Sequence, residues 1–138
     1  MATATDADTR FMAAACALAR RGLGWVWPNP AVGCIVLDAA GQVAGRGWTR
    51  PGGRPHAETE ALGAAGDKAL GGTAYVTLEP CSHHGETPPC ADALIKAGIR
   101  RVVAPMSDPD PRVQGAGFRR LREAGVEVIE GVGVKEAE

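Results

Sequence analysis

The sequence predicts an α/β domain in which a hairpin and several parallel strands share one mixed sheet. Two observations support this prediction. Two short apolar runs, at 31–38 and 41–48, are joined by a short turn at 39–41, and such a pair is typical of an antiparallel hairpin. From residue 73 onward the order is strand, helix, strand, helix, strand, which indicates parallel strands covered by helices.

Local signals define the first elements. Asp8 or Thr9 can cap a helix that runs through an Ala-rich stretch to about Arg21, because short side chains with an oxygen accept hydrogen bonds from the free N–H groups of a helix start. Gly22 then ends the helix. The segment 27–30 contains two prolines, each of which extends the residue before it, so we expect a rigid loop there.

The later elements bring separated residues to one edge of the sheet. Helices are expected at 56–65, 91–98 and 117–125, and strands at 72–78, 100–106 and 126–132. Ligands bind beyond the carboxyl ends of parallel strands. The segments Glu79–Cys81 and Ser107–Asp110 each follow a strand, so both should lie at that edge, where helices also begin.

Composition argues against several classes of protein. The 138 residues, 45% hydrophobic and 22% charged, fit one domain, residues 1–138, with a core of its own. A net charge of −1 and 4% aromatic residues give no basic, stacking surface for nucleic acid. No apolar run approaches the roughly eighteen residues of a membrane span. We therefore expect a cytoplasmic protein that binds a small molecule, neither nucleic acid nor membrane, and keeps its cysteines reduced.

The segment EPCSHHGETPPC, residues 79–90, contains two of the four cysteines and two of the three histidines. With His56 before it, the chain can offer one imidazole and two thiolates, from His56, Cys81 and Cys90. This ligand set suits zinc, and three protein ligands leave the fourth tetrahedral position to water, as at catalytic sites. Such a zinc ion lowers the pKa of its water to about 7.

Glu58 follows His56 by two residues and so does not share its helix face. It is better placed as a general acid/base that takes a proton from water and delivers it to a leaving group. H-x-E followed by P-C-x-x-C is the signature of zinc deaminases, although here eight residues instead of two separate Cys81 from Cys90. A closed structural zinc site, completed by His83 or His84, is an alternative that leaves Glu58 without a role.

The segments WPNPAVGC, HAE and TLEPCSHHGETPPCADALIKAGIRRVV closely resemble the deaminase domain of riboflavin biosynthesis, over nearly the whole chain. That enzyme acts on 2,5-diamino-6-ribosylamino-4(3H)-pyrimidinone 5′-phosphate. The resemblance implies a cytidine-deaminase-like three-layer fold, with a mixed five-stranded sheet and helices on both faces. It also implies Zn2+ on His56, Cys81 and Cys90, with Glu58 as the proton shuttle in a hydrolase that releases ammonia.

The resemblance further implies a substrate pocket, for which we expect Asn29, His83, Asp108, Asp110 and Thr49. An amide such as Asn29 offers both a donor and an acceptor to a base edge. Thr49 and Asp110 replace a histidine and an asparagine that are common in relatives. Glu86 stands where relatives carry Lys or Arg, so the phosphate needs another cation, such as Arg50, Arg54 or one from a neighbouring subunit.

The resemblance also concerns partners. It favours a homo-oligomer, a dimer or larger, and the family's C-terminal reductase is absent from this chain, so a separate reductase is a possible partner. Two alternatives stay open. One is another nucleobase, nucleoside or tRNA deaminase of the same superfamily, and the other is a non-catalytic module folded by zinc. Cys16 and Cys34 are expected to be small buried hydrophobic residues.

Overall fold

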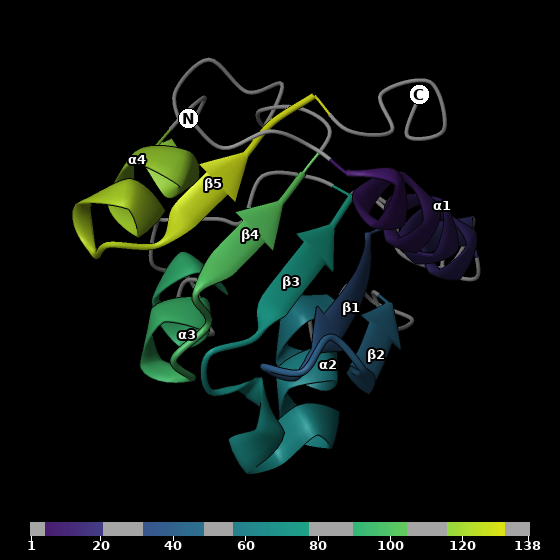
Figure 1. Ribbon diagram of the computed structural model, residues 1–138, viewed down its shortest axis with the longest axis horizontal. Helices are drawn as coiled ribbons and strands as arrows, with labels where there is room; N and C mark the ends of the chain where they lie inside the picture. The colour runs from purple at the N-terminus through teal and green to yellow at the C-terminus, as the bar shows by residue number, and fades with distance from the viewer. Residues whose placement is uncertain (1–4, 21–31, 49–56, 78–89, 105–115, 132–138) are drawn as a thin grey trace.

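The computed structural model describes residues 5–20, 32–48, 57–77, 90–104 and 116–131. These ranges form a five-stranded sheet in the order β2-β1-β3-β4-β5, with helices on both faces (Figure 1). The strands are β1 Gly33–Leu37, β2 Val43–Trp48, β3 Thr73–Val76, β4 Arg101–Val103 and β5 Glu127–Ile129. The helices are α1 Asp6–Arg20, α2 Ala57–Ala65, the 3-10 helix η2 Gly66–Ala69, α3 Cys90–Lys96 and α4 Ala116–Glu123.

The pairing of the strands confirms the predicted mixed sheet. β1 pairs antiparallel with β2 on one side and with β3 on the other. β3, β4 and β5 run parallel to one another, and β2, as a second antiparallel neighbour of β1, shares their direction. The predicted hairpin and the predicted β-α-β-α-β order are both present.

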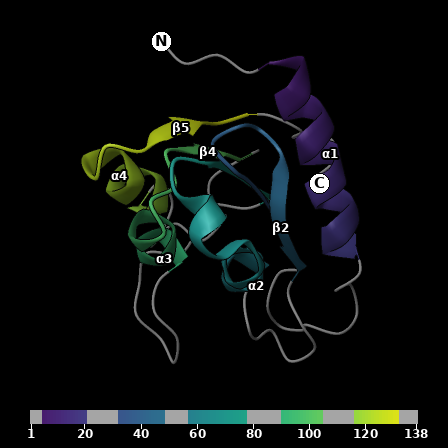
Figure 2. The same cartoon turned by 60° about the horizontal axis from the view of Figure 1, so that its bottom comes forward.

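Side-chain alternation divides the interior into two cores, one on each face of the sheet. In β1, Cys34 and Val36 pack with α2 and α3, whereas Ile35 and Leu37 pack with α1. Successive side chains of a strand point to opposite faces, and both faces of β1 are covered, so all five of its residues are buried. Figure 2 shows α1 on one side of the sheet and α2, α3 and α4 on the other.

The N-terminus of α1 differs from the prediction that Asp8 or Thr9 caps it. The Asp8 N–H donates to Thr5 Oγ1 at 3.2 Å, and the Thr5 N–H donates to Asp8 Oδ2 at 2.9 Å. This reciprocal pair is a capping box in which Thr5 is the cap and Asp8 stands three residues into the helix. The prediction was wrong because the helix begins at Asp6, earlier than expected, and Thr5 supplies the capping oxygen.

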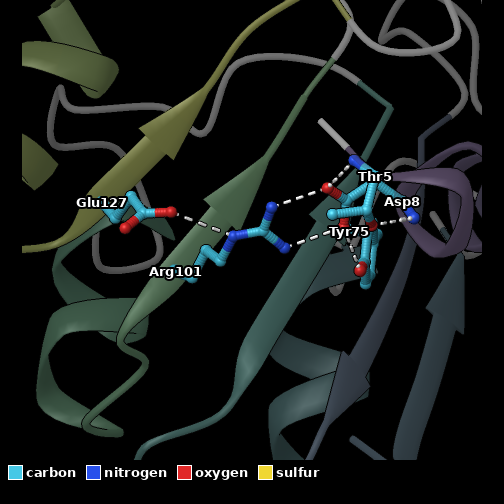
Figure 3. A network of polar contacts seen from close by, with 5 residues as sticks. All are labelled: Thr5, Asp8, Tyr75, Arg101 and Glu127. Carbon is cyan, nitrogen blue, oxygen red and sulfur yellow. Dashed lines mark hydrogen bonds and ion pairs between the residues drawn. The ribbon is translucent and has the colours of Figure 1, made fainter. Parts of the chain in front are cut away.

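A buried polar network ties α1 to the sheet (Figure 3). Asp8 is 1% exposed; its carboxylate accepts two hydrogen bonds from Arg101, at 2.8 and 2.6 Å, and one from the Tyr75 hydroxyl, at 2.6 Å. Arg101 also donates from Nε to Glu127 at 3.1 Å. Burial opposes ionisation of Asp8, but the hydrogen bonds from Arg101 and Tyr75 hold its pKa well below the usual range.

Two smaller predictions are also confirmed. Gly98, at φ 80°, ends the turn after α3. Cys16 and Cys34 are buried in the two cores, as expected of small hydrophobic residues. None of the helices in the described part of the chain is long and apolar enough to cross a membrane.

Candidate active site

The sheet topology brings several segment ends to one edge. α2 connects the end of β2 with the start of β3, and α3 connects the end of β3 with the start of β4. Because these three strands run in the same direction, both helices begin at the carboxyl edge of β3. β1 runs the opposite way, so its first residue, Gly33, lies at that edge too. We call this the carboxyl edge of the sheet.

Glu58 lies at the carboxyl edge, in the first turn of α2, and its side chain is 5% exposed. Three polar or charged side chains are buried among the described residues: Asp8, Glu58 and Thr77. Burying a carboxylate costs free energy unless it is paired, and buried acids gather at functional sites. A helix N-terminus favours a negative charge. The position predicted for the general acid/base therefore holds a buried carboxylate.

Cys34 lies within electrostatic range of this carboxylate. Burial raises the pKa of the Cys34 thiol well above its usual value, and the negative charge of Glu58 raises it further. Cys34 pairs with Val76 of β3 and with Gly47 of β2. Glu58 is thus close to the central part of the sheet, and the neutral thiol adds no second charge beside it.

Two hydrogen bonds of Thr77 connect the end of β3 with the start of β1. Its N–H donates to the Gly33 carbonyl at 3.1 Å, and its Oγ1 accepts the Gly33 N–H, also at 3.1 Å. The hydroxyl thus takes the place that the Thr77 carbonyl would have in a continued antiparallel ladder. This contact closes the ladder immediately before the segment that leads to Cys81, and immediately after the segment that contains Asn29.

Most of the other predicted site residues lie outside the described residues: His56, Cys81, Asn29, Thr49, His83, Asp108 and Asp110. Cys90 is placed as the first residue of α3. Within the described ranges no three His, Cys, Asp or Glu side chains form a metal-binding group, and only one of the three predicted ligands falls inside those ranges. The ligand set itself therefore stays a prediction.

The described framework is compatible with a zinc ion on the predicted ligands. His56 immediately precedes Ala57, the first residue of α2, and Cys90 begins α3. Ala57 and Ala91 belong to the same core cluster, and both helices begin at the carboxyl edge. One imidazole and two thiolates are a donor set that zinc accepts, so the residues fit this metal.

Thr77 was not among the predicted site residues. A threonine at the end of an apolar strand looks like an ordinary strand residue, because threonine has high strand propensity. Its partner Gly33 is 44 positions away, and no local pattern indicates such a contact. Thr77 was therefore predicted only as a residue of the strand at 72–78.

Comparison with known proteins identifies a family. The family described as "Cytidine and deoxycytidylate deaminase zinc-binding region" matches residues 5–106. This range contains the His-Ala-Glu and Pro-Cys segments and the whole of α2 and α3. The match covers more than half of the chain, and it supports the zinc cofactor that the resemblance implied.

Individual relatives narrow the assignment. The riboflavin biosynthesis protein RibD of Escherichia coli is 55% identical over 95% of this chain, which spans 35% of that protein. RibD of Acinetobacter baumannii superposes with a TM-score of 0.90 at 48% identity, over 95% of this chain and 37% of that one. The diaminohydroxyphosphoribosylamino-pyrimidine deaminase of Buchnera aphidicola is 44% identical, over 95% of this chain and 88% of that protein.

The chain thus spans about a third of the RibD proteins but most of the Buchnera deaminase. Its fold, with the five-stranded mixed sheet and helices on both faces, agrees with these neighbours. This chain belongs to the zinc-binding cytidine and deoxycytidylate deaminase family and, within it, to the diaminohydroxyphosphoribosylamino-pyrimidine deaminases.

Proposed function

We propose that this domain catalyses the hydrolytic deamination of 2,5-diamino-6-ribosylamino-4(3H)-pyrimidinone 5′-phosphate in riboflavin biosynthesis. The observation that supports this proposal is the buried carboxylate of Glu58 in the first turn of α2, at the carboxyl edge of the sheet. A buried acid beside a predicted zinc ligand suits proton transfer better than a structural role. The names of the relatives indicate the substrate class.

Zinc held by His56, Cys81 and Cys90 would supply Lewis acidity that makes water nucleophilic at neutral pH. The Glu58 carboxylate accepts the proton that water loses as its oxygen bonds to the ring carbon bearing the amine. Glu58 then gives that proton to the departing nitrogen, which leaves as ammonia. The second proton of the water passes to the neighbouring ring nitrogen, so that a ring carbonyl replaces the amine. Glu58 therefore starts and ends the cycle as a carboxylate, and its burial keeps bulk water from competing for the proton.

The substrate contacts are part of the same proposal. Asn29, held between two prolines, would read the donor and acceptor groups of the pyrimidinone edge. His83, Asp108, Asp110 and Thr49 would complete the pocket. The proposal also includes a cytoplasmic homo-oligomer. It further includes a separate reductase as a partner, because a Thermotoga maritima relative, 45% identical and spanned to 38% by this chain, is described as a deaminase and reductase in one protein.

Ammonia release from a small panel of substrates tests the function. The zinc-loaded protein is incubated with the diaminopyrimidinone phosphate, cytidine, dCMP and guanine, and ammonia is measured over time. We expect turnover of the diaminopyrimidinone phosphate at a kcat/KM at least about 100-fold above that of the others, because groups built to bind one base edge are left unpaired by another. Preferred turnover of cytidine or dCMP would contradict the proposal.

Removal of zinc separates a catalytic site from a structural one. Dialysis against a chelator, followed by ammonia release and thermal unfolding of the same sample, should show lost turnover while the cooperative unfolding transition persists. A structural zinc ion contributes directly to folding, so its removal unfolds the domain. Loss of the folded state in step with the metal would favour the non-catalytic zinc module.

A further inference from the structure

The underside of α2 rests directly on the backbone of β2. Two glycines of this strand, Gly45 and Gly47, alternate with Ala44, Arg46 and Trp48, so both present their missing side chains to the same face. A Cβ at Gly45 would lie 2.1 Å from the Ala61 carbonyl oxygen. Ordinary contacts between non-bonded heavy atoms are about 3.5 Å or more, so a larger residue at 45 must displace the part of α2 between Ala61 and Ala65.

Gly47 makes the corresponding contact one turn earlier in α2. A Cβ there would lie 2.4 Å from the Ala57 carbonyl oxygen, 2.6 Å from Glu60 Cβ and 2.8 Å from the Ala61 nitrogen. Two of these three atoms belong to the helix backbone, which no side-chain rotation can move aside. Any residue larger than glycine at 47 must therefore displace the first turn of α2.

The helix side of this contact is equally small. Ala57, Ala61 and Ala65 recur every four residues, so they lie on one face of α2, and all three are buried in the core cluster shared with the sheet. On the strand side, Gly47 is the register partner of Cys34. The negative charge of Glu58 contributes to the raised pKa of the Cys34 thiol. The contact at Gly47 thus lies beneath the turn that contains Glu58.

We propose that Gly47 is a positioning residue for the deamination: its missing side chain sets the first turn of α2 and thereby the places of Glu58 and the adjacent His56. Gly45 supports the same helix one turn later, between Ala61 and Ala65, and serves packing only. This inference rests on the proposed function for the role of Glu58. A misplacement of about 1 Å can cost about 100-fold in rate.

Two alanine variants of β2 test whether Gly47 positions Glu58 while Gly45 contributes only to packing. Gly47→Ala and Gly45→Ala each add one methyl group beneath α2, and the closer contact is the one at Gly45. The measurements are kcat and KM for the diaminopyrimidinone phosphate, zinc affinity of the apoprotein by chelator competition, and the midpoint of thermal unfolding. The zinc titration needs no substrate, so it reports on the first turn of α2 independently of turnover.

We expect the two glycine variants to differ in kcat and zinc affinity but to lose similar amounts of stability. Gly47→Ala should lower kcat about 100-fold with KM within about twofold, and should weaken zinc about 10-fold, as changes to groups supporting a ligand do. Gly45→Ala should lower the unfolding midpoint at least as much and keep kcat and zinc affinity within about threefold of the parent. Equal losses of kcat and zinc affinity in the two variants would overturn the proposal.

A second pair of variants covers the case in which Gly47→Ala does not fold. Ala57→Ser and Ala65→Ser each add one oxygen to the helix side of the same contact, at its two ends. The first should lower kcat and zinc affinity more than the second, and the reverse order would overturn the proposal. If the unmodified protein deaminates none of the substrates, the proposed function fails, whereas the zinc titrations of the glycine pair still decide the role of Gly47.

Discussion

Two helices, α1 and α2, pack on opposite faces of β1 by different means. α1 is attached by long side chains: Met12 and Leu18 are buried in its core, and Asp8 forms an ion pair with Arg101. α2 packs on the sheet through small residues: the glycines of β2 contact the alanines of α2, so the two backbones lie close together. Gly33 makes one such close contact with α1, where a Cβ would lie 2.0 Å from the Ala15 carbonyl oxygen.

The difference is related to what each helix positions. A long arginine side chain can follow a helix that shifts by a few tenths of an ångström, so the N-terminal end of α1, which Asp8 attaches to Arg101, tolerates small movement. A backbone-to-backbone contact has no rotatable bond between its parts; α1 makes one further along, at Ala15, whereas α2 makes one in its first turn, at Ala57. The predicted catalytic acid, Glu58, is in that first turn, as a site that needs accurate geometry requires.

The largest expected effect on activity comes from Glu58→Gln on α2. The amide keeps the size of the side chain but cannot accept and return a proton, so kcat should fall about 100- to 10,000-fold. Zinc content should stay at the parent level, because Glu58 is not a predicted ligand. Ammonia release and metal analysis on the same sample measure both. Glu60→Gln, two residues later in α2, is the matched control, and a Glu58→Gln variant with parental kcat would refute the assigned role.

On α1, the largest expected effect is on stability. Asp8→Ala removes the partner of Arg101, which is only 21% exposed, and leaves the guanidinium without its carboxylate. Breaking a buried pair from one side costs about 3 kcal/mol in the free energy of unfolding. Urea unfolding measures this change, and kcat per folded molecule should stay at the parental value. Asp6→Ala, exposed in the same helical turn, should cost no more than about 1 kcal/mol.

The lowered pKa of Asp8 predicts that the protein loses stability in acid. The pKa of Asp8 in the folded protein lies below its value in the unfolded chain, near 3.9, so the unfolded state binds the proton more tightly. The contribution of Asp8 is therefore fully present above about pH 5 and declines as the pH falls through the folded pKa. Asp8→Asn should show a shallower decline in urea unfolding between about pH 5 and pH 2. A decline as steep as that of the parent would mean that other carboxylates dominate.

An intermediate effect is expected at the carboxyl edge. Thr77→Val keeps the shape of the side chain but removes the oxygen that accepts the Gly33 N–H. A buried donor without a partner costs about 1–3 kcal/mol, to be measured by urea unfolding. Thr73→Val, at the other end of β3 and half-buried, is the control and should change stability by less than about 1 kcal/mol. Equal losses in the two variants would argue against a special role of the Thr77 hydroxyl.

These sites also show which parts of the structure a sequence can predict. The hairpin, the parallel order and the place of Glu58 in a helical first turn follow from patterns within about ten residues of one another, which local chemistry specifies. The cap at Thr5 also carried a local signal, because Thr5 and Asp8 have the spacing of a capping box, whereas the contact of Asp8 with Arg101 spans 93 positions and follows from no local pattern. Gly45 and Gly47 did carry a local signal, since glycine inside a strand often marks close approach of another backbone.

The smallest effect is expected for an exposed ion pair that resembles the Asp8 pair only in charge. Arg122 of α4 donates to Glu130 at 2.8 Å, but the two side chains are 50% and 42% exposed. Water solvates both partners whether or not they meet, so Arg122→Ala should change the free energy of unfolding by less than about 1 kcal/mol. Urea unfolding of this variant, of Glu130→Ala and of the double variant isolates the pair, and a coupling as large as that between Asp8 and Arg101 would mean that burial is not what distinguishes the α1 attachment.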